Sequence, residues 1–403
     1  MSDLIYSTFQ AISKRTRDRK IILWGTGDIA HKTMRKLNTS PTVAVDNDTN
    51  VWGISFAGLS IHPPSKLADG SLLKPYVIIC STSYADISRQ LDDIGFAPEI
   101  DYAVSPILND LRILNEIEEY KTDLIFTSGA PPRDDPAIGG GIYLLEVDGN
   151  EWEHRKLFSG NSHGITRYED GYVAVDDDQG FINFDEKFQL IQNVEIEHGL
   201  RPHGIAYSEA TESFYVASTY TDSIIQFDRN FRQIGKIQVS NKIEREGKPM
   251  HHINDLCVIG SSLYVSMFSL SGNWTRDVFD GGVLEFDLTD GSKCGPVITD
   301  LWMPHSVLFI DGGLTVLDSL RGQLRRNNAQ SVGTFPGFTR GLGYDGNMFF
   351  VGQSRNRNYS KYMGLSQNIS IDTSIIIFDE ATKVSRSISL PSKISEIHSI
   401  VNV

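Results

Sequence analysis

Apolar and polar positions recur in one order six times between about residue 123 and residue 403. Each repeat has a polar residue at a turn, an apolar strand, a strand ending in small or polar residues, and a strand that often ends in Phe-Asp. Five of the repeats are continuous, and they begin at His163, His203, Asn254, His305 and Arg340. Repeats of roughly 40 to 50 residues with four short strands are typical of propeller blades. The pattern therefore predicts a β-propeller.

The sixth repeat is split between the two ends of this region. Its first strand is the final segment of the chain, HSIVNV from His398 to Val403, and its other strands are DLIFTSG at 123–129, GIYLLEV at 141–147 and EWEHRKLF at 151–158. Pairing of the last strand with the earlier ones closes the ring and leaves no open sheet edge. We expect a six-bladed β-propeller over residues 123–403 with velcro closure by the C-terminal strand.

The first 105 residues follow a different pattern, in which apolar strands alternate with helical stretches. Such alternation is typical of a parallel sheet covered by helices. It predicts a Rossmann-like α/β domain over residues 1–105. An apolar stripe with helical spacing over residues 106–122 predicts a helix that links this domain to the propeller.

A GxGxxA motif lies between the first predicted strand and the helix that follows it. Glycines at these positions permit a tight turn and a close approach of phosphate to the backbone, and a carboxylate after the second strand can accept a ribose hydroxyl. The motif predicts a site for a nucleotide or nucleotide-sugar. Its candidate residues are Gly25, Thr26, Gly27, Asp28, Ala30 and Asp46. In the alternative, the glycines serve only strand–helix packing and the domain binds nothing.

The segments IILWGTGDIAHKTMRKL, AVDND and YVIICSTSYADISRQLDDIGF, within about residues 20–105, resemble the small Rossmann-like domain at the N-terminus of bacterial sugar O-acyltransferases. The resemblance implies that the Gly-rich turn and the acidic residue after the second strand face a nucleotide-sugar. The hexapeptide-repeat β-helix of those enzymes is absent from this sequence. Their acyl transfer and their catalytic histidine are therefore not implied.

Polar residues occupy one register of the propeller repeat, at the turn before the innermost strand of each blade. The six are His163, His203, Asn254, His305, Arg340 and His398. Because the innermost strands line the central channel, we expect these side chains to converge at one mouth of the channel. Grouped neutral imidazoles bind Zn²⁺ or Fe²⁺, with open positions for water and substrate. The four histidines of this ring are thus candidate ligands of a divalent transition metal.

Three residues in or beside this ring are candidates for catalysis. His252 is placed to transfer a proton, and Asp255 adds a carboxylate. Arg340 favours a carboxylate or phosphate ligand, since a cation beside a metal is unfavourable unless an anion lies between them. In the alternative, polar residues at these turns only cap strand ends and bind water in the channel.

The segments RPHGIAY, HHINDL, MPHSV, LDSLRGQL and EIHSIV, among others across residues 195–403, resemble an uncharacterised bacterial β-propeller family known only as a domain of unknown function. The resemblance supports the fold and the polar positions, and it implies no reaction. More distantly, the arrangement of six blades is similar to that of six-bladed metal-dependent lactonases and lyases. Their Glu/Asn/Asp metal set is not reproduced here, so their chemistry is not implied.

Charge and composition narrow the class of protein. The chain of 403 residues has 51 Asp and Glu against 37 Lys and Arg, and the resulting charge of −14 disfavours nucleic acid as a partner. The three cysteines are far apart, no apolar run is long enough to span a bilayer, and no signal peptide is evident, so we expect a cytoplasmic protein. Insertions at 129–140, 269–282 and 355–373 are expected at one face of the propeller, where Trp274 is available to stack on a sugar.

These features predict a metal-assisted enzyme with lyase, hydrolase or epimerase chemistry on a sugar or nucleotide-sugar in polysaccharide or glycoconjugate biosynthesis. The alternative is a non-catalytic module that binds a ligand or partner within such an assembly. A GxSxG nucleophile motif at a strand–helix turn is absent from the sequence, which argues against hydrolases of that type. The oligomeric state stays open.

Overall fold

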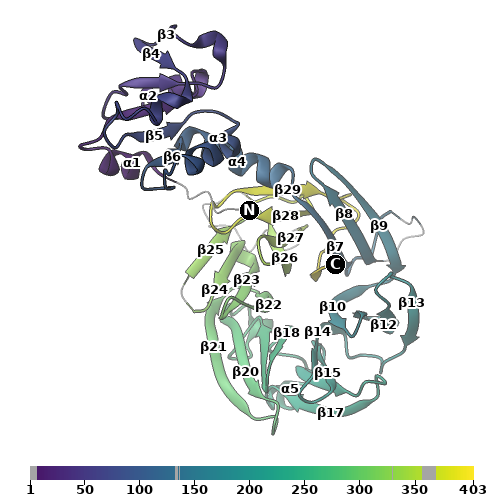
Figure 1. The fold of residues 1–403 in the computed structure, drawn as a ribbon. Helices are drawn as coiled ribbons and strands as arrows, with labels where there is room; N and C mark the ends of the chain where they lie inside the picture. Colours follow the sequence, from purple (N-terminus) through teal and green to yellow (C-terminus); the bar gives the residue numbers. More distant parts are fainter. Residues whose placement is uncertain (1–6, 132–134, 136, 329, 356–368) are drawn as a thin grey trace. The chain divides into compact units, whose positions relative to one another are not determined.

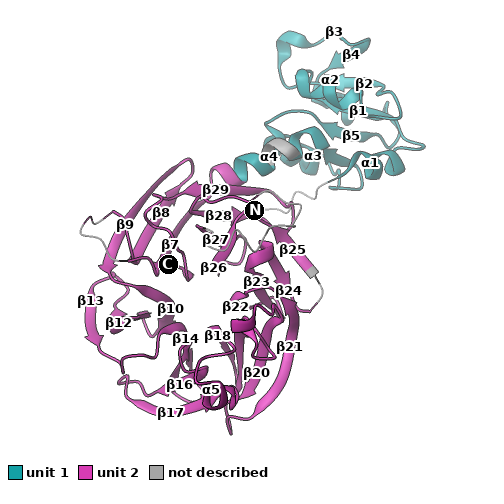
Figure 2. Cartoon of the chain, turned by 180° about the vertical axis from the view of Figure 1, so that it is seen from behind, with its two compact units in different colours: residues 1–116 teal, residues 117–403 magenta. Residues whose placement is uncertain are grey.

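The computed structural model of the chain describes residues 7–131, 135, 137–328, 330–355 and 369–403. The chain forms two compact units, residues 1–116 and residues 117–403 (Figures 1 and 2). Separate hydrophobic clusters fill the two units. Residues 132–134, 136 and 356–368, which belong to two of the expected insertions, lie outside the described part of the chain.

The N-terminal unit contains one sheet of six short strands in the order β3-β4-β2-β1-β5-β6. Its strands are β1 (Ile21–Trp24), β2 (Val43–Val45), β3 (Ser55–Phe56), β4 (Leu59–His62), β5 (Tyr76–Ile79) and β6 (Tyr102–Val104). Its helices are α1 (Phe9–Arg15), α2 (Asp28–Met34), α3 (Tyr84–Asp93), α4 (Pro106–Glu118) and the 3₁₀ turns η1 (Thr49–Val51) and η2 (Pro64–Leu67). The central strands β1 and β5 are apolar throughout because both of their faces are buried.

The prediction of a Rossmann-like α/β domain is wrong. The sheet is mixed, because β3 pairs antiparallel with β4. Only two crossovers between parallel strands contain an α-helix, the one from β1 to β2 and the one from β5 to β6, whereas β2, β4 and β5 are joined through 3₁₀ turns. A doubly wound fold needs a helix in each crossover to cover the sheet. Here the segment 46–75 is too rich in turns to supply those helices, and the chain as a whole is mostly β.

The second unit is a six-bladed β-propeller, as the repeat predicts (Figure 1). Blade one contains β10 (Ser162–Tyr168), β11 (Gly171–Asp176), β12 (Gly180–Phe184) and β13 (Leu190–Val194). Blade two contains β14 (Pro202–Ser208), β15 (Ser213–Ser218), β16 (Ser223–Phe227) and β17 (Gln233–Gln238), followed by α5 (Lys242–Glu246). Blade three contains β18 (Ile253–Ile259), β19 (Ser262–Met267), β20 (Gly281–Asp287) and β21 (Lys293–Leu301), with η3 (Trp274–Arg276) between β19 and β20.

Three further blades complete the ring. Blade four contains β22 (His305–Ile310), β23 (Gly313–Asp318), η4 (Ser319–Arg321), β24 (Gln323–Arg326) and β25 (Gln330–Thr334). Blade five contains β26 (Phe338–Tyr344), β27 (Phe349–Ser354), β28 (Ser374–Phe378) and β29 (Ser385–Ser389). Blade six contains β30 (Ile400–Asn402), β7 (Lys121–Ser128), β8 (Gly141–Asp148) and β9 (Glu151–Ser159).

The last strand of the chain closes the propeller. β30 pairs antiparallel with β7, and Ile400 lies opposite Phe126. The side chain of Ile400 is buried in a cluster that also contains Phe126 and Tyr143 of blade six and Ile377 of blade five. The closing strand therefore joins the two ends of the ring through apolar packing as well as through backbone hydrogen bonds. In the described residues, no helix has both the length and the apolar character needed to cross a membrane.

Candidate functional site

Backbone bulges place the ring residues at the mouth of the channel. The innermost strands of blades one, two, three and five break register with the next strand at the ring position, and in blade four the break comes directly after His305, which pairs with Leu317. In blade one the regular pairing stops at Ser162 and resumes at Ile165, so His163 lies inside the bulge. A bulge re-aims a side chain out of the alternation of its strand. In four blades the bulge thus contains the ring residue itself, which strict alternation would aim differently.

Small residues after the ring positions allow the inner strands to come close together. A Cβ atom on Gly164 would lie 2.5 Å from the carbonyl oxygen of His203, and one on Gly204 would lie 2.6 Å from the Cα atom of Asp255. Only glycine fits such approaches, because a real Cβ never comes this near to backbone atoms. The ring is therefore narrow, and its side chains are in direct contact.

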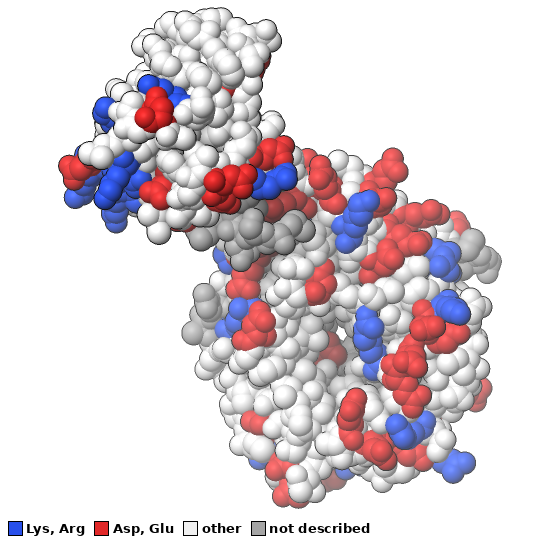
Figure 3. Space-filling view, viewed as in Figure 1, with Lys and Arg blue, Asp and Glu red and all other residues white. Residues whose placement is uncertain are grey.

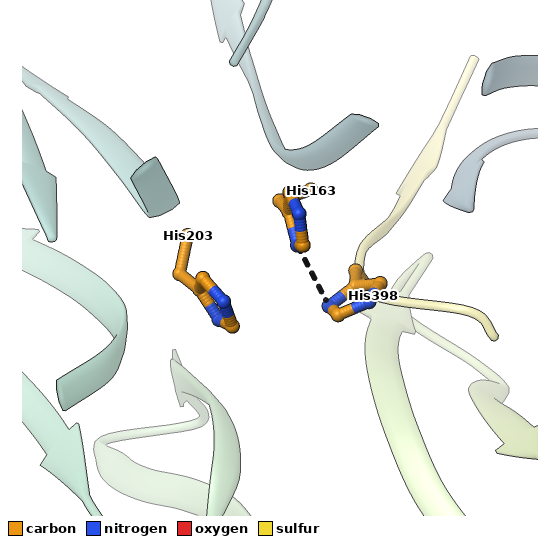
Figure 4. A group of neighbouring side chains, drawn as sticks. All are labelled: His163, His203 and His398. Atoms are coloured by element: carbon orange, nitrogen blue, oxygen red, sulfur yellow. Dashed lines mark hydrogen bonds between the residues drawn. The ribbon is translucent and has the colours of Figure 1, made fainter. Parts of the chain in front are cut away.

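His163, His203 and His398 form a compact group at this point (Figure 4). One ring nitrogen from each lies within 4.8 Å of the others. The imidazole of His163 stacks on that of His203 with centroids 4.4 Å apart, and its Nδ1 is 3.3 Å from Nδ1 of His398. The three come from blades one, two and six, which are consecutive in space although His398 is more than 190 positions away from both others in the sequence.

Polar atoms in this group lack partners. Among the described residues, Nε2 of His163, Nε2 of His203 and Oδ1 of Asn254 are buried without a hydrogen bond. They border a cavity of about 10 Å³ that the four ring histidines, Asn254 and Asp255 line. That is about the smallest cavity that accepts one water molecule or one metal ion. Buried polar atoms are normally satisfied, so the cavity has the chemistry of a site for a single polar guest.

The opposite side of the ring is satisfied by the protein itself. Nδ1 of His305 is 2.8 Å from Oγ of Ser319, and its Nε2 accepts a hydrogen bond from Nε of Arg340 at 3.1 Å. Nη1 of Arg340 donates to Oε2 of Glu396 at 2.7 Å. Both ring nitrogens of His305 are thus engaged, and this histidine lies outside the compact group. Asn254 donates its amide N–H groups to the carbonyl oxygens of His252 and Pro304.

Glu396 connects the two sides. Its Oε2 atom also lies 3.2 Å from Nε2 of His398. With Nε2–H donating to this carboxylate, the lone pair of Nδ1 of His398 faces His163. Carboxylate–histidine pairs of this kind orient imidazoles that bind metals. The carboxylate also offsets the charge of Arg340, which removes the conflict between that cation and a nearby metal.

Burial favours the neutral form of three ring histidines. It holds the pKa of His163, of His203 and of His305 well below the usual range, and the charges of neighbouring groups lower these pKa values further. Neutral imidazole is the form that binds metal ions. The electrostatics of the ring therefore favour ligation over the formation of several buried cations.

The catalytic candidates His252 and Asp255 flank Asn254, the blade-three ring residue, in the sequence. His252 stacks on Phe268 with centroids 4.2 Å apart and lies 6.0 Å from the ring of His203. Burial lowers the pKa of His252 to about 3, so it is neutral near pH 7. Asp255 lines the small cavity, and burial raises the pKa of its carboxyl to about 6. Asp255 therefore borders the cavity directly, whereas His252 lies beside His203 without lining it.

Aromatic side chains stand beside the ring on blades three to five. His252 and Trp274 have centroids 5.5 Å apart, and Phe268 packs edge-on against Trp274 at 4.6 Å. We call this feature the aromatic wall. Its members are Phe268, Trp274, Phe279, Trp302 and Phe338. The insertion between β19 and β20 thus reaches the ring, since Trp274 and Phe279 belong to it. Figure 3 shows the propeller hollowed at its centre.

A family of sequences shares this architecture. The family described as domain of unknown function (DUF4915) matches residues 145–403, which is more than half of the chain and includes every ring position. The chain belongs to this family. Residues 17–99 match a second family, described as C2185-like, N-terminal. The comparisons do not support the expected resemblance of this segment to sugar O-acyltransferases.

Solved structures resemble the DUF4915 chain at the level of the propeller. A chain of a nidogen/laminin complex covers 70% of this chain and 98% of its own length, at 11% identity and a TM-score of 0.48. A protein of unknown function from Bacteroides caccae covers 70% and 99%, at 15% identity and a TM-score of 0.49. A Lactobacillus plantarum protein covers 70% of this chain and 100% of its own length, at 13% identity and a TM-score of 0.43. Likenesses this distant say nothing about function. No curated protein matches the chain.

The N-terminal unit of this DUF4915 protein has a pocket of its own. It has a volume of about 440 Å³ and lies at the carboxyl ends of β1, β2 and β5. Gly25 is required there, because its φ is +106° and a Cβ would lie 2.8 Å from the carbonyl oxygen of Cys80. Gly27 has open space around it instead. Asp46 accepts hydrogen bonds from Oγ1 of Thr26 at 2.7 Å and from the backbone N–H of Asp48.

The other two candidate residues of the glycine motif have different surroundings. Asp28 lines the edge of the pocket and pairs with Lys32, with 2.7 Å between Nζ and the carboxylate. Ala30 is fully buried and packs in the core, away from the pocket lining. Helix α2 begins at Asp28 and has only seven residues. The polar part of the pocket is therefore supplied mainly by hydroxyl groups and carboxylates, and the helix that follows the glycine motif is short.

Two charged residues near the ring were not predicted from the sequence. Glu396 and Arg201 each stand two positions before a ring histidine, as His252 stands two positions before Asn254. Arg201 and His252 share a left-handed backbone, with φ of 48° and 53°. The repeat contained the signal that would have found them: the register two residues before the ring holds a second set of polar side chains in several blades.

Proposed function

We propose that the propeller is a metal-dependent enzyme in which His163, His203 and His398 hold a divalent transition metal, Zn²⁺ or Fe²⁺. One observation carries the proposal: the imidazoles of His163, His203 and His398 meet at a cavity of atomic size, where Nε2 of His163 and Nε2 of His203 are buried without partners. Three histidine ligands leave a position for water and substrate. A bound ion would supply a Lewis acid or lower the pKa of a water molecule.

The spacing of the nitrogen atoms supports this proposal. Two nitrogen ligands of a tetrahedral zinc, each about 2.0–2.1 Å from the ion, are about 3.3–3.4 Å apart. The Nδ1 atoms of His163 and His398 are 3.3 Å apart. His203 faces the same point (Figure 4), and one of its ring nitrogens lies within 4.8 Å of a ring nitrogen of each of the other two histidines. His305 has both nitrogens engaged, so it supports the ring without being a ligand in this arrangement.

The surroundings of the ring suit a small sugar-like substrate and proton transfer at it. The aromatic wall offers flat apolar faces next to polar groups, a combination typical of ligand sites. His252 lies between the wall and the metal group, where its neutral imidazole can accept or donate a proton. Lyase, hydrolase and epimerase reactions all require such a group. A non-catalytic binding module is the alternative, and it predicts ligand binding without turnover.

Metal analysis tests the proposal directly. The protein is purified without a histidine tag, and its metal content is measured by mass spectrometry before and after removal and re-addition of Zn²⁺. We expect about one ion per chain, and a loss of at least about tenfold in affinity in His163→Ala, His203→Ala and His398→Ala. His198→Ala is the matched control, because His198 is an exposed histidine of the same unit.

Near-ultraviolet circular dichroism shows whether each variant is folded. A wild-type protein that binds no transition metal at micromolar free concentration would contradict the proposal. Retention of full metal content in all three alanine variants would contradict it equally.

A second ligand site is supported by the pocket in the N-terminal unit. We propose that it binds a nucleotide or nucleotide-sugar, with Asp46 accepting a ribose hydroxyl and Thr26 close by. Isothermal titration with UDP-glucose, UDP and ATP is compared between wild type and Asp46→Asn. Binding that is weakened about tenfold in the variant supports the proposal. No heat with any of the three compounds contradicts it.

A further inference from the structure

The pocket of the N-terminal unit has two chemically different sides. Its two carboxylates, those of Asp28 and Asp46, follow β1 and β2. The side that follows β5 is lined by three consecutive hydroxyl residues, Ser81, Thr82 and Ser83. Among the described residues that line the pocket, none is a lysine or an arginine. One side therefore offers negatively charged acceptors, and the other offers hydroxyl groups that can donate hydrogen bonds.

Trp24 adds a donor to the hydroxyl side of the pocket. Residues of β1 alternate between the two faces of the sheet, and Trp24 packs in the same hydrophobic cluster as Ile87 of α3. Its side chain is only 1% exposed and lines the pocket. Within the described part of the chain, its Nε1–H is buried without a hydrogen-bond partner. A buried donor without an acceptor is costly, so we expect the ligand of this pocket to supply the acceptor.

Helix α3 (Tyr84–Asp93) begins on the same side of the pocket. It has ten residues, its N-cap is Ser83, and no side chain of the described residues caps its first turn. The N–H groups of a first turn and the helix dipole favour an anion at this end. Asp86 in this turn is exposed, forms an ion pair with Arg89 and is not among the residues that line the pocket. The hydroxyl side thus has the backbone of an anion site as well as the side-chain donors.

Gly25 brings these donors together. A Cβ atom on Gly25 would lie 2.8 Å from the carbonyl oxygen of Cys80 and 3.4 Å from Cβ of Ser81. The end of β1 therefore packs directly against the turn between β5 and α3. Oγ of Ser81 accepts a hydrogen bond from the N–H of Ser83 at 3.2 Å, and it can still donate its own proton. The indole N–H, the hydroxyl of Ser81 and the first turn of α3 belong to one side of the pocket.

Helix α2, which follows the glycine motif, is less suited to an anion. It has seven residues and begins with Asp28, whose carboxylate pairs with Lys32 and lines the pocket. The negative charge of Asp28 offsets the positive end of the helix dipole. The two helices pack in different hydrophobic clusters, α2 through Ala30 and α3 through Ile87 (Figure 1). The distribution of charge therefore favours α3 over the helix that the glycine motif precedes.

We propose that the N-terminus of α3 and the indole N–H of Trp24 bind a phosphate group of the ligand in this pocket. The ligand lies across the glycine turn, with its ribose at Asp46 and its phosphate at residues 81–83. This inference rests on the proposed nucleotide site for the rest of the ligand. Phosphate oxygens accept hydrogen bonds and carry negative charge, whereas ribose hydroxyls donate to a carboxylate. The ligand class is thus a nucleoside phosphate rather than a nucleoside.

Isothermal titration with paired probes tests this inference. The probes are uridine and UDP, adenosine and ADP, and inorganic pyrophosphate, each added to the full-length protein at about 0.15 M ionic strength. Trp24→Phe removes the indole N–H and keeps an aromatic ring. Thr82→Glu places a negative charge on an exposed residue of the pocket lining. Thr39→Glu is the matched control, because Thr39 is also exposed and precedes the amino end of β2, away from the carboxyl ends that form the pocket.

We expect at least one diphosphate to bind the wild type about tenfold or more tightly than its nucleoside. Trp24→Phe should weaken binding of that diphosphate at least about tenfold, because a hydrogen bond to a charged acceptor is lost, and it should have little effect on the nucleoside. Thr82→Glu should weaken it at least as much through repulsion, while Thr39→Glu should match the wild type. Near-ultraviolet circular dichroism shows whether the variants are folded.

Two results would overturn this inference alone: a nucleoside that binds as tightly as its diphosphate, or a diphosphate that the wild type, Trp24→Phe and Thr82→Glu bind equally. If that diphosphate loses affinity in Asp46→Asn, the proposed nucleotide site stands without this phosphate position. If only pyrophosphate binds, and both changes weaken it, the anion site holds and the nucleotide proposal fails. Absence of binding by every probe at millimolar concentration contradicts both proposals.

Discussion

His163, His203 and His398 lie on one side of the channel mouth, in blades one, two and six, whereas His305 and Arg340 lie on the other, in blades four and five. All five occupy the same register of one repeat. On the second side the nitrogens are engaged with Ser319, Arg340 and Glu396, while on the first side Nε2 of His163 and Nε2 of His203 are buried without partners. The position in the repeat therefore determines where a side chain points. The residues that surround the side chain determine whether it is held by the protein or is available to a ligand.

Removal of Glu396 should have the largest effect on this contrast. Glu396→Ala leaves Arg340 buried without this carboxylate and frees Nε2 of His398 from it. Loss of one partner of a buried ion pair costs about 3–5 kcal/mol. Urea unfolding measures the change. Glu212→Ala is the control. Because Glu212 is exposed, this change should alter the free energy of unfolding by no more than about 0.5 kcal/mol. A change of similar size in both variants would show that the buried pair is unimportant.

Gly129→Ala should disturb His398 and His163 directly. Its Cβ would lie 2.5 Å from Nε2 of His398 and 3.0 Å from Cε1 of His163. Overpacking of this kind costs about 1–3 kcal/mol, and displacement of two imidazoles should reduce zinc affinity by tenfold or more. Gly27→Ala is the matched control, since Gly27 has open space and a φ of −89°. Normal zinc affinity in Gly129→Ala would count against the proposed ligands.

His305→Gln should separate stability from metal binding. The change removes the acceptor of Nε of Arg340 and the contact with Ser319, so the free energy of unfolding should fall by about 1–2 kcal/mol. Zinc content should stay close to the wild-type value, because His305 lies outside the compact group. Urea unfolding and metal analysis of the same preparation check both expectations. Loss of the metal together with stability would place His305 among the ligands.

The pH dependence of the metal-free protein should show a smaller effect. The folded state keeps His163, His203 and His305 neutral, whereas the unfolded chain binds protons below about pH 6.5. The free energy of unfolding should therefore fall as the pH drops from 6.5, by up to about 1.4 kcal/mol per histidine and pH unit. Asp255 acts in the opposite direction between about pH 6 and 4, since its pKa of about 6 in the folded protein lies above its unfolded value.

His305→Gln should reduce this slope by about 1 kcal/mol per pH unit, and Arg232→Gln should leave it unchanged. Urea unfolding at pH 7, 6 and 5 in the presence of a chelator measures it. A slope that is the same in all three proteins would mean that His305 is protonated in the folded state.

The propeller could be predicted from the sequence because its pattern is repeated. Six copies of one pattern average out local ambiguity, so the blades, their innermost strands and the closing strand could be placed. The N-terminal unit offers only one copy of each signal. Its apolar strands and Gly25 matched a familiar motif, but turns and a short antiparallel pair occupy the segment where that motif requires helices.

The sequence by itself determined the propeller, its closure in blade six by the last strand, and the ring of polar positions, because these follow from periodicity. The tertiary structure alone decided which members of the ring have partners. Glu396 and Ser319 satisfy one side through contacts over distances that no local pattern encodes, and Gly129 reaches His398 across 269 positions of sequence. Hydrogen bonding depends on tenths of an ångström, and those distances arise only when all six blades close on one another.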